Sequence, residues 1–183
     1  MTRAHGIVTL LACTLACAGC GTGHKRPAAK TPPPLAQAQA THEWPSPPAP
    51  RQTATGASAS PLNAIRAFAA AYINWDAHTV ARDMRALAGR SIGQARAAMT
   101  LAAAETAGDY ELQRGGIANH GAVEAVAPLA SHQHEYVVVT LESTTATNTT
   151  AYQGLKPAWH VALATVTQQR AGQWVLSAWQ PEN

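Results

Sequence analysis

Tyr136-Val137-Val138-Val139 is the stretch that decides the fold class, because an aromatic residue followed by three β-branched residues favours a strand. The predicted strand covers His134 to Ser143. Other segments of the second half alternate between apolar and polar residues, as strands with one buried face do. These further predicted strands are Tyr110 to Arg114, Ile117 to Ala127 (broken by Gly121), Trp159 to Gln168 and Trp174 to Gln180.

The connections of the second half are a Thr-rich loop over Thr144 to Lys156 and a five-residue hairpin loop over Gln169 to Gln173, which contains Gly172. In the last strand, strict alternation predicts that Leu176 and Trp179 face opposite sides of the sheet.

The first half of the chain predicts helices. Ser60-Pro61 is a helix start, with Ser as the N-cap and Pro at the first helical position, and apolar residues follow at helical spacing to about Trp75. Asp76 to Thr79 interrupts the pattern, and a second helix follows over Val80 to Gly89. The segment Ser91 to Gln94 predicts a capping box that begins an alanine-rich helix reaching about Thr106. So many alanines on one helix indicate close approach to a neighbouring element.

Helices followed by a run of antiparallel strands are typical of the α+β class. Two motifs, Phe68-Ala69-Ala70-Ala71-Tyr72-Ile73-Asn74-Trp75 and Trp174-Val175-Leu176-Ser177-Ala178-Trp179, carry a resemblance to the NTF2-like (cystatin-like) superfamily. The resemblance covers about Pro61 to Glu182. It implies N-terminal helices packed into a cone-shaped, curved antiparallel sheet of about four to five strands. More narrowly, the motifs look like those of actinobacterial conjugal-transfer-type lipoproteins, which resemble the extracytoplasmic scaffold domains of type IV secretion systems.

The N-terminus has the pattern of an export signal. Arg3 precedes an uncharged apolar run from Gly6 to Ala18, which is too short for the roughly 20 residues of a membrane-spanning helix. The run ends at Gly19-Cys20 and resembles a bacterial lipobox, although Cys17 stands where Leu or Val is usual. We expect residues 1–19 to be a lipoprotein signal peptide and Cys20 to carry diacylglyceryl and palmitate. Two acyl chains hold a protein stably on a membrane, here on its extracytoplasmic face.

Residues 20–60 are predicted to be a lipidated, disordered stalk, because they contain eight prolines and almost no large apolar side chain. Trp44 is the exception, and it leaves open a docking peptide around Trp44-Pro45-Ser46-Pro47-Pro48. Residues 61–183 are predicted to form one domain. The chain of 183 residues carries a net charge of +3, but this domain has eight basic and nine acidic side chains. A nucleic-acid-binding surface is therefore not expected.

Enzymes of the NTF2-like superfamily place Asp, His and Tyr inside the cone as general bases and hydrogen-bond donors. The resemblance makes residues of these types in this chain candidates for the same roles. No pair of them has a diagnostic spacing, so structural roles are favoured. His132-Gln133-His134-Glu135 resembles part of a metal site but lacks a third ligand, and a solvated loop is favoured there. We expect no catalytic residue, no cofactor and no metal. The candidates weighed are Tyr72, Asp76, His78, Tyr110, His120 and His160.

The sequence favours a non-enzymatic lipoprotein whose domain contacts protein partners at the cell envelope, as an accessory of a conjugation or secretion complex. Exposed Trp75, Trp159 or Trp179 would anchor such contacts, whereas packing in the core is the favoured alternative for Trp159 and Trp174. A purely structural envelope role stays open. A small-molecule binder, or an isomerase- or dehydratase-like enzyme of the same fold, is the other alternative. It requires a cavity of about 300 Å³ or more with convergent polar groups.

Overall fold

A computed structural model confirms the α+β class and describes residue 36 and residues 48–182. The predicted signal peptide, Cys20 and Trp44 lie outside the described residues. The helices precede the long strands, as predicted. The elements are α2 (Pro61–Ile73), β1 (Trp75–Asp76), α3 (Val80–Gly89), α4 (Gly93–Thr106), α5 (Tyr110–Gly115), β2 (Ile117–Pro128), β3 (Glu135–Ala146), β4 (Ala158–Gln168), the 3-10 turn η1 (Arg170–Gly172) and β5 (Trp174–Glu182).

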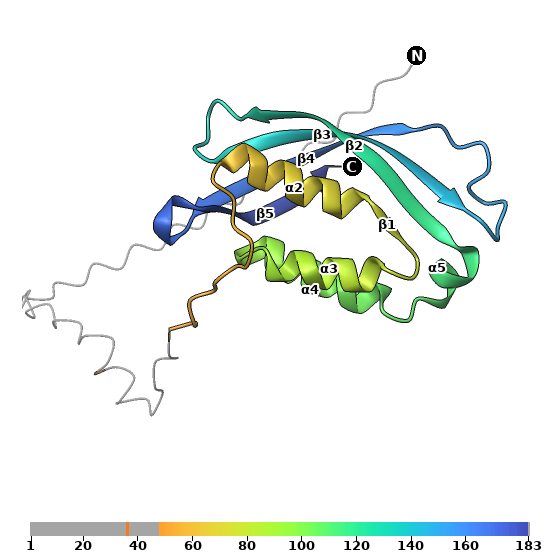
Figure 1. The fold of residues 1–183 in the computed structure, drawn as a ribbon, viewed down its shortest axis with the longest axis horizontal. Coiled ribbons are helices and arrows are strands. Elements are labelled where there is room, and N and C mark those ends of the chain that lie inside the picture. Colours follow the sequence, from red (N-terminus) through yellow and green to blue (C-terminus); the bar gives the residue numbers. More distant parts are fainter. Residues whose placement is uncertain (1–35, 37–47, 183) are drawn as a thin grey trace, which may run out of the picture. The chain divides into compact units, whose positions relative to one another are not determined.

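The sheet has five antiparallel strands in the order β1-β2-β3-β4-β5. It curls into a half-barrel over the helices, so that α2 lies in its concave side and α3 and α4 run beneath α2 (Figure 1). The arrangement is consistent with the predicted NTF2-type cone. Within the described residues, no helix is both long and apolar enough to cross a membrane.

The core lies between α2, α3, α4 and the concave face of the sheet. Phe68 of α2 packs against Trp179 of β5 with ring centroids 5.4 Å apart, and Tyr72 meets the same indole edge-on at 5.3 Å. The predicted close approach of α4 is confirmed by its small buried side chains, Ala95 and Ala103. The sheet contributes five smaller buried residues, namely Val138, Ala162, Ala164, Val166 and Leu176.

Helix α2 begins as predicted, because the Ser60 hydroxyl accepts a hydrogen bond from the Asn63 N–H at 3.2 Å. It ends at Ile73, two residues before the predicted end. The Asn74 side chain forms hydrogen bonds with both the end of α2 and strand β2. Its amide nitrogen donates to Ala70 O at 2.8 Å and to Gly121 O at 3.1 Å, and its Oδ1 accepts from the Gly121 N–H. This clamp ties α2 to β2 and leaves Trp75 to form the short strand β1.

The predicted strand over Tyr110 to Arg114 is wrong, since these residues form the helix α5. The Asp109 carboxylate caps it by accepting from the Leu112 N–H at 3.0 Å, and Gly116 ends it in the left-handed conformation at φ 59°. The Arg114 guanidinium lies 5.9 Å from the centre of the Tyr110 ring, one turn away. In so short a segment, the capping interactions at its two ends decide between helix and strand, and the alternation of apolar and polar residues does not.

The predicted capping box at Ser91 to Gln94 is also wrong. The Ser91 hydroxyl is buried and donates backwards to Leu87 O at 2.9 Å. The Gln94 side chain instead pairs with the edge of the sheet: its Oε1 accepts from the Trp179 N–H at 2.9 Å, and its Nε2 donates to Trp179 O at 3.3 Å. This pairing covers part of the edge of β5, together with a backbone bond from the Ile92 N–H to Leu176 O, and so protects the edge from pairing with another strand.

The strands depart from simple alternation at two bulges. Strand β2 continues through Gly121, contrary to the predicted break, and its irregularity lies instead between Val123 and Ala125. In β5, the register shift against β4 leaves Ser177 unpaired. The predicted opposite facing of Leu176 and Trp179 is therefore wrong, since both belong to the core cluster.

Three predicted boundaries also move. Strand β3 begins at Glu135 and runs to Ala146, so it takes over the first residues of the predicted Thr-rich loop. The compact unit begins at Ala49 rather than at Pro61. Its first residues form a strap that reaches β5, where the Ser58 N–H donates to Trp174 O at 3.0 Å and the Trp174 N–H donates to Ser58 O at 2.8 Å.

Candidate functional site

A cluster of four polar side chains lies on the inner face of β2 and β3 beside the end of α2. Asn119 is its centre: Nδ2 donates to Ile73 O at 2.8 Å and to Glu142 Oε2 at 2.7 Å, while Oδ1 accepts from the Thr144 hydroxyl at 3.1 Å. The Thr140 hydroxyl donates to the other Glu142 oxygen at 2.6 Å. We call Asn119, Thr140, Glu142 and Thr144 the Glu142 cluster.

A cavity of about 130 Å³ adjoins the Glu142 cluster and is lined by Tyr72, His160 and Trp179 among others. The indole Nε1 of Trp179 is buried and has no hydrogen-bond partner among the described residues. Burial raises the pKa of the Tyr72 hydroxyl above 10.0, the Trp179 indole N–H opposes this shift, and the Glu142 charge adds to it. The indole N–H thus lies close to the hydroxyl, although their geometry falls short of a hydrogen bond.

The chemistry available at this cavity is mostly hydrogen-bond donation. Both Glu142 oxygens already accept a hydrogen bond within the protein, one from Asn119 and the other from Thr140. The Tyr72 hydroxyl keeps its proton at neutral pH. The cavity is smaller than the 300 Å³ or more of a typical ligand site.

The structure brings together only two of the six candidate residues, Tyr72 and His160. Asp76 is the last residue of β1, and its side chain has the favoured structural role of holding the turn before α3: its Oδ1 accepts from the His78 N–H at 2.8 Å and the Thr79 N–H at 3.0 Å, and these bonds lower its pKa below 3.8. The side chain of His78 is exposed. Tyr110 is exposed on α5, and His120 is exposed on β2.

His160 and Trp159 face opposite sides of β4, and it is His160, not Trp159, that lies on the side of the core. Ala162 and Ala164 continue the phase of His160 and are buried in the core, so His160 faces the helices at the open end. Trp159 is 63% exposed, which contradicts its predicted core packing. The reason is that helices α2, α3 and α4 cover the other side of the sheet (Figure 1).

The His132 to Glu135 segment is a turn between β2 and β3. His132 Nδ1 lies 3.6 Å from Glu135 Oε2, whereas His134 has a positive φ of 65° and its ring lies 5.0 Å from that of Trp174. The two histidines therefore do not share a strand face. In the part of the chain that the structure describes, no three His, Cys, Asp or Glu side chains gather to hold a metal ion.

Asn119 and Glu142 were not among the predicted candidates. A signal for Glu142 exists in the sequence, because Thr140, Glu142 and Thr144 continue the phase of Val138, which is fully buried in the middle of β3. Polar residues that alternate along β3 on the same side as a buried valine indicate that the inner face of the sheet becomes polar toward the C-terminal end of β3. Asn119 carries no such signal, since only the register of β2 against β3 pairs it with Thr144.

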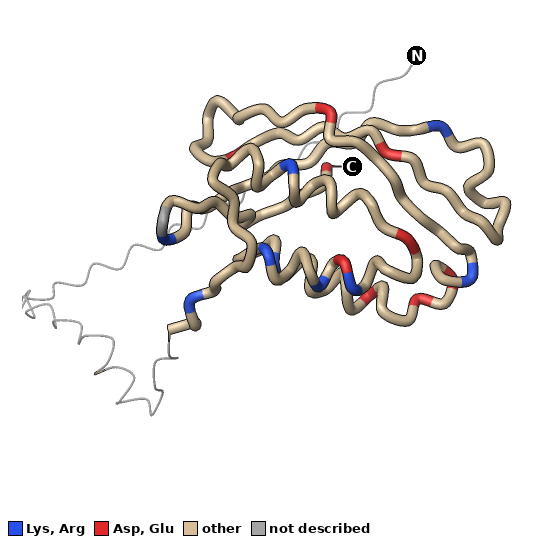
Figure 2. The backbone as a smooth tube through the Cα atoms, viewed as in Figure 1, with Lys and Arg blue, Asp and Glu red and all other residues tan. Residues whose placement is uncertain are grey.

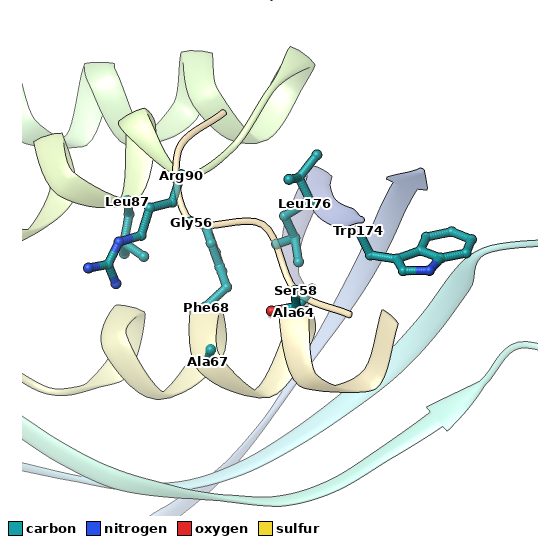
Figure 3. Close-up of a pocket in the computed structure, with 10 residues that line it drawn as sticks. Gly56, Ser58, Ala64, Ala67, Phe68, Leu87, Arg90, Trp174 and Leu176 are labelled. Atoms are coloured by element: carbon teal, nitrogen blue, oxygen red, sulfur yellow. The ribbon is translucent and has the colours of Figure 1, made fainter. Parts of the chain in front are cut away.

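A second, smaller pocket of about 60 Å³ lies where the strap crosses α2, α3 and β5 (Figure 3). Phe68, Leu87 and Leu176 form its apolar wall, and the side chain of Arg90 extends away from Leu176 (Figure 3). This volume holds about two water molecules. The pocket lacks convergent polar side chains, so we interpret it as imperfect packing beneath the strap.

The remaining tryptophans divide between core and surface. Trp179 is only 3% exposed, so it cannot anchor a partner, and Trp75 and Trp174 are half-buried against the core. Among the tryptophans that the structure describes, only Trp159 is available. It lies beside Val161, which is 39% exposed, on the side of the sheet away from the helices. We call the side chains of β3 and β4 on that side the outer apolar face: Val137, Val139, Leu141, Trp159, Val161 and Leu163.

Comparison with known proteins gives no family for this chain: no protein-family model matches it, and no curated protein matches it. A function can therefore be based on two features described above: the cavity beside the Glu142 cluster, which we call the Glu142 cavity, and the outer apolar face.

Proposed function

We propose that this protein is a membrane-anchored extracytoplasmic lipoprotein whose α+β domain is a non-catalytic protein-interaction module, held by lipid at Cys20. The observation that carries the proposal is the outer apolar face. Trp159 at 63% exposure and Val161 at 39% lie side by side on it. An exposed tryptophan next to apolar neighbours is the kind of residue that dominates binding energy in protein interfaces.

The charge of the face supports a protein partner rather than a nucleic acid. Strand β4 contains no Lys, Arg, Asp or Glu, and β3 contains only Glu135 and Glu142 (Figure 2). Glu142 points inward to Asn119. Nucleic-acid binding requires a basic surface, which this face lacks. The resemblance to conjugal-transfer-type lipoproteins makes a conjugation or secretion complex the proposed setting.

Photo-cross-linking in cells tests the interaction. A photoreactive amino acid placed at position 159 should form adducts with specific envelope proteins. The same group at position 101 is the control, because Leu101 is 59% exposed but lies on α4. Adducts from position 159 alone support the proposal, whereas equal or absent adducts at both positions refute it.

A metabolic lipid label tests the anchor separately. Wild-type protein should take up the label and fractionate with membranes, and the Cys20→Ser variant should do neither. A labelled Cys20→Ser variant would mean that another residue is modified.

A small-molecule binder is the second candidate, and one observation favours it. Tyr72 and Trp179 both line the Glu142 cavity, and the buried Trp179 Nε1 has no hydrogen-bond partner among the described residues, so after a small shift of these side chains the two groups could donate to an acceptor such as a carbonyl oxygen. A volume of about 130 Å³ limits that ligand to a few heavy atoms. Quenching or a shift of tryptophan fluorescence in wild type, absent in Tyr72→Phe, during a screen of small carbonyl compounds would support this candidate.

A further inference from the structure

We propose that one end of the domain docks on the anionic lipid head groups of the membrane surface, so that the rest of the domain projects away from the membrane. This inference rests on the proposed function and orients the same domain. Four arginines define the docking end, and we call them the basic end: Arg51 of the strap, Arg90 after α3, Arg96 of α4 and Arg170 of the β4–β5 hairpin.

Contacts between the strap, the helices and the hairpin bring these arginines together. Arg51 and Arg170 line the same groove of about 620 Å³, which lies between the strap, the start of α4 and the hairpin. The Arg96 guanidinium donates to Thr53 O, two residues along the strap from Arg51. Arg90 lines the small pocket beneath the strap (Figure 3). Arginines that are far apart in the sequence therefore meet where the strap crosses the helices.

The two ends of the domain differ in charge. The segments that form the basic end, residues 51–60, 89–96 and 168–174, contain four arginines and no acidic residue. At the opposite end, residues 74–83 and 105–116 contain five acidic side chains and two basic ones. Figure 2 shows blue positions at the strap and the hairpin, and red positions where α3 begins and α4 ends. The domain is therefore polarised along α3 and α4.

Three arginines of the basic end are available to a partner. Arg51, Arg90 and Arg170 are exposed, and no salt bridge within the described residues involves them. Glu135 lies on the strand next to β4, but its carboxylate is 3.6 Å from His132 Nδ1. A cluster of exposed arginines without acidic counter-charges attracts an anionic surface.

The place where the chain enters the domain favours lipid as that surface. The compact unit begins at Ala49, two residues before Arg51, and the predicted lipid anchor at Cys20 precedes Ala49 by 29 residues. A flexible coil of this length spans about 30 Å root-mean-square. Such a tether keeps the basic end within reach of the lipid head groups and raises their effective concentration, so a weak attraction is sufficient for docking.

Docking by the basic end presents the outer apolar face to other proteins. Trp159 is the second residue of β4, and Gln168 ends the strand at the hairpin. At roughly 3.3 Å per residue, Trp159 lies about 30 Å from the basic end. This separation keeps the exposed indole out of the lipid interface, where tryptophan also partitions, and leaves it accessible to an envelope protein.

Vesicle cosedimentation tests the docking. The sample is the predicted mature chain, which begins at residue 20, with Cys20→Ser to remove the lipid. We expect binding to vesicles of phosphatidylcholine mixed with phosphatidylglycerol, which salt weakens, and no binding to phosphatidylcholine alone. The double variant Arg51→Gln and Arg170→Gln should bind about 25-fold more weakly, since each basic side chain near an anionic lipid surface strengthens binding about fivefold.

The matched control removes the same charge from the opposite end. Arg82 and Arg114 are also exposed, and the double variant Arg82→Gln and Arg114→Gln should change binding by less than about twofold. Lys25, Arg26 and Lys30 of the predicted stalk attract the vesicles in every variant, so the difference between variants is the test. Wild-type binding by the basic-end variant, or an equal loss in the control, would overturn the proposal.

Energy transfer to a dye-labelled lipid tests the orientation without changing any arginine. Gln173 of the hairpin and Ala158 at the other end of β4 are both exposed. A donor dye on Gln173→Cys should transfer more energy to acceptors at the vesicle surface than the same dye on Ala158→Cys. Equal transfer from both positions would contradict docking by the basic end.

The outcomes separate this inference from the proposed function, because the vesicle assays need neither lipid at Cys20 nor a protein partner of Trp159. If the vesicle assays fail while the lipid label and the adducts at position 159 are found, the inference fails and the proposed function stands. If docking occurs without label or adducts, the proposed function alone fails. A photoreactive residue at position 51 that forms adducts with an acidic envelope protein, and none with lipid, would also overturn the lipid assignment.

Discussion

Replacing Asn119 by alanine should be among the most damaging single changes in the Glu142 cluster. Asn119 is 6% exposed and makes three hydrogen bonds that join the end of α2 to β2 and β3. The substitution leaves Ile73 O and one Glu142 oxygen without their donor. A buried polar group that loses its partner costs about 1–3 kcal/mol of stability. The cost for the Glu142 oxygen lies at the low end of this range, because Glu142 is half-buried. The free energy of unfolding should therefore fall by about 2–4 kcal/mol.

Urea unfolding followed by far-UV circular dichroism measures this loss. With a typical urea dependence of about 2 kcal/mol per molar, the unfolding midpoint should fall by about 1–2 M. Asn63→Ala is the matched control, since that side chain is exposed on α2, and its effect should stay within about 0.5 kcal/mol. A double-mutant cycle with Glu142→Gln should show coupling of at least about 0.5 kcal/mol. A loss below about 0.5 kcal/mol, or a cycle without coupling, would refute the role assigned to this network.

Three further changes test other parts of the fold. Gly121→Ala should destabilise by about 1–3 kcal/mol in the same urea assay, because its Cβ would lie 2.7 Å from Leu141 O, whereas Gly89→Ala, with its nearest such contact at 3.9 Å, should be nearly neutral. The hydrogen bonds to Asp76 lower its pKa in the folded state, so its contribution is present above pH 4 and is lost as the pH falls through that lowered pKa. Asp76→Ala should thus be less stable than wild type at pH 7, and thermal melts should show the difference shrinking below pH 4; a constant difference would contradict the assignment. Ser60→Ala should cost about 1 kcal/mol of unfolding free energy through loss of the α2 N-cap, and an unchanged melting temperature would show that the cap is unimportant.

The spacing of apolar residues along the sequence was sufficient to predict the helices and strands that bury one continuous face. The α+β class, the limits of α3, the N-cap of α2 and the strands β3, β4 and β5 follow from spacing, caps and β-branched residues, which act over a few neighbouring residues. The candidate site was predicted less well. Tyr72 and His160 were named, but Asn119 and Glu142 were not, because hydrogen bonds between residues 23 apart depend on strand register.

The sequence by itself therefore determined the fold class and the succession of helices before the long strands, and it predicts the export signal and the lipid anchor at Cys20. The tertiary structure decided what neighbouring residues cannot specify. It turned the predicted strand at Tyr110 into a helix, paired Gln94 with Trp179 on β5, and exposed Trp159 while burying Trp179. The physical reason is that burial depends on which side of the sheet the helices cover, and a bulge of one residue at Ser177 moves Trp179 to that side.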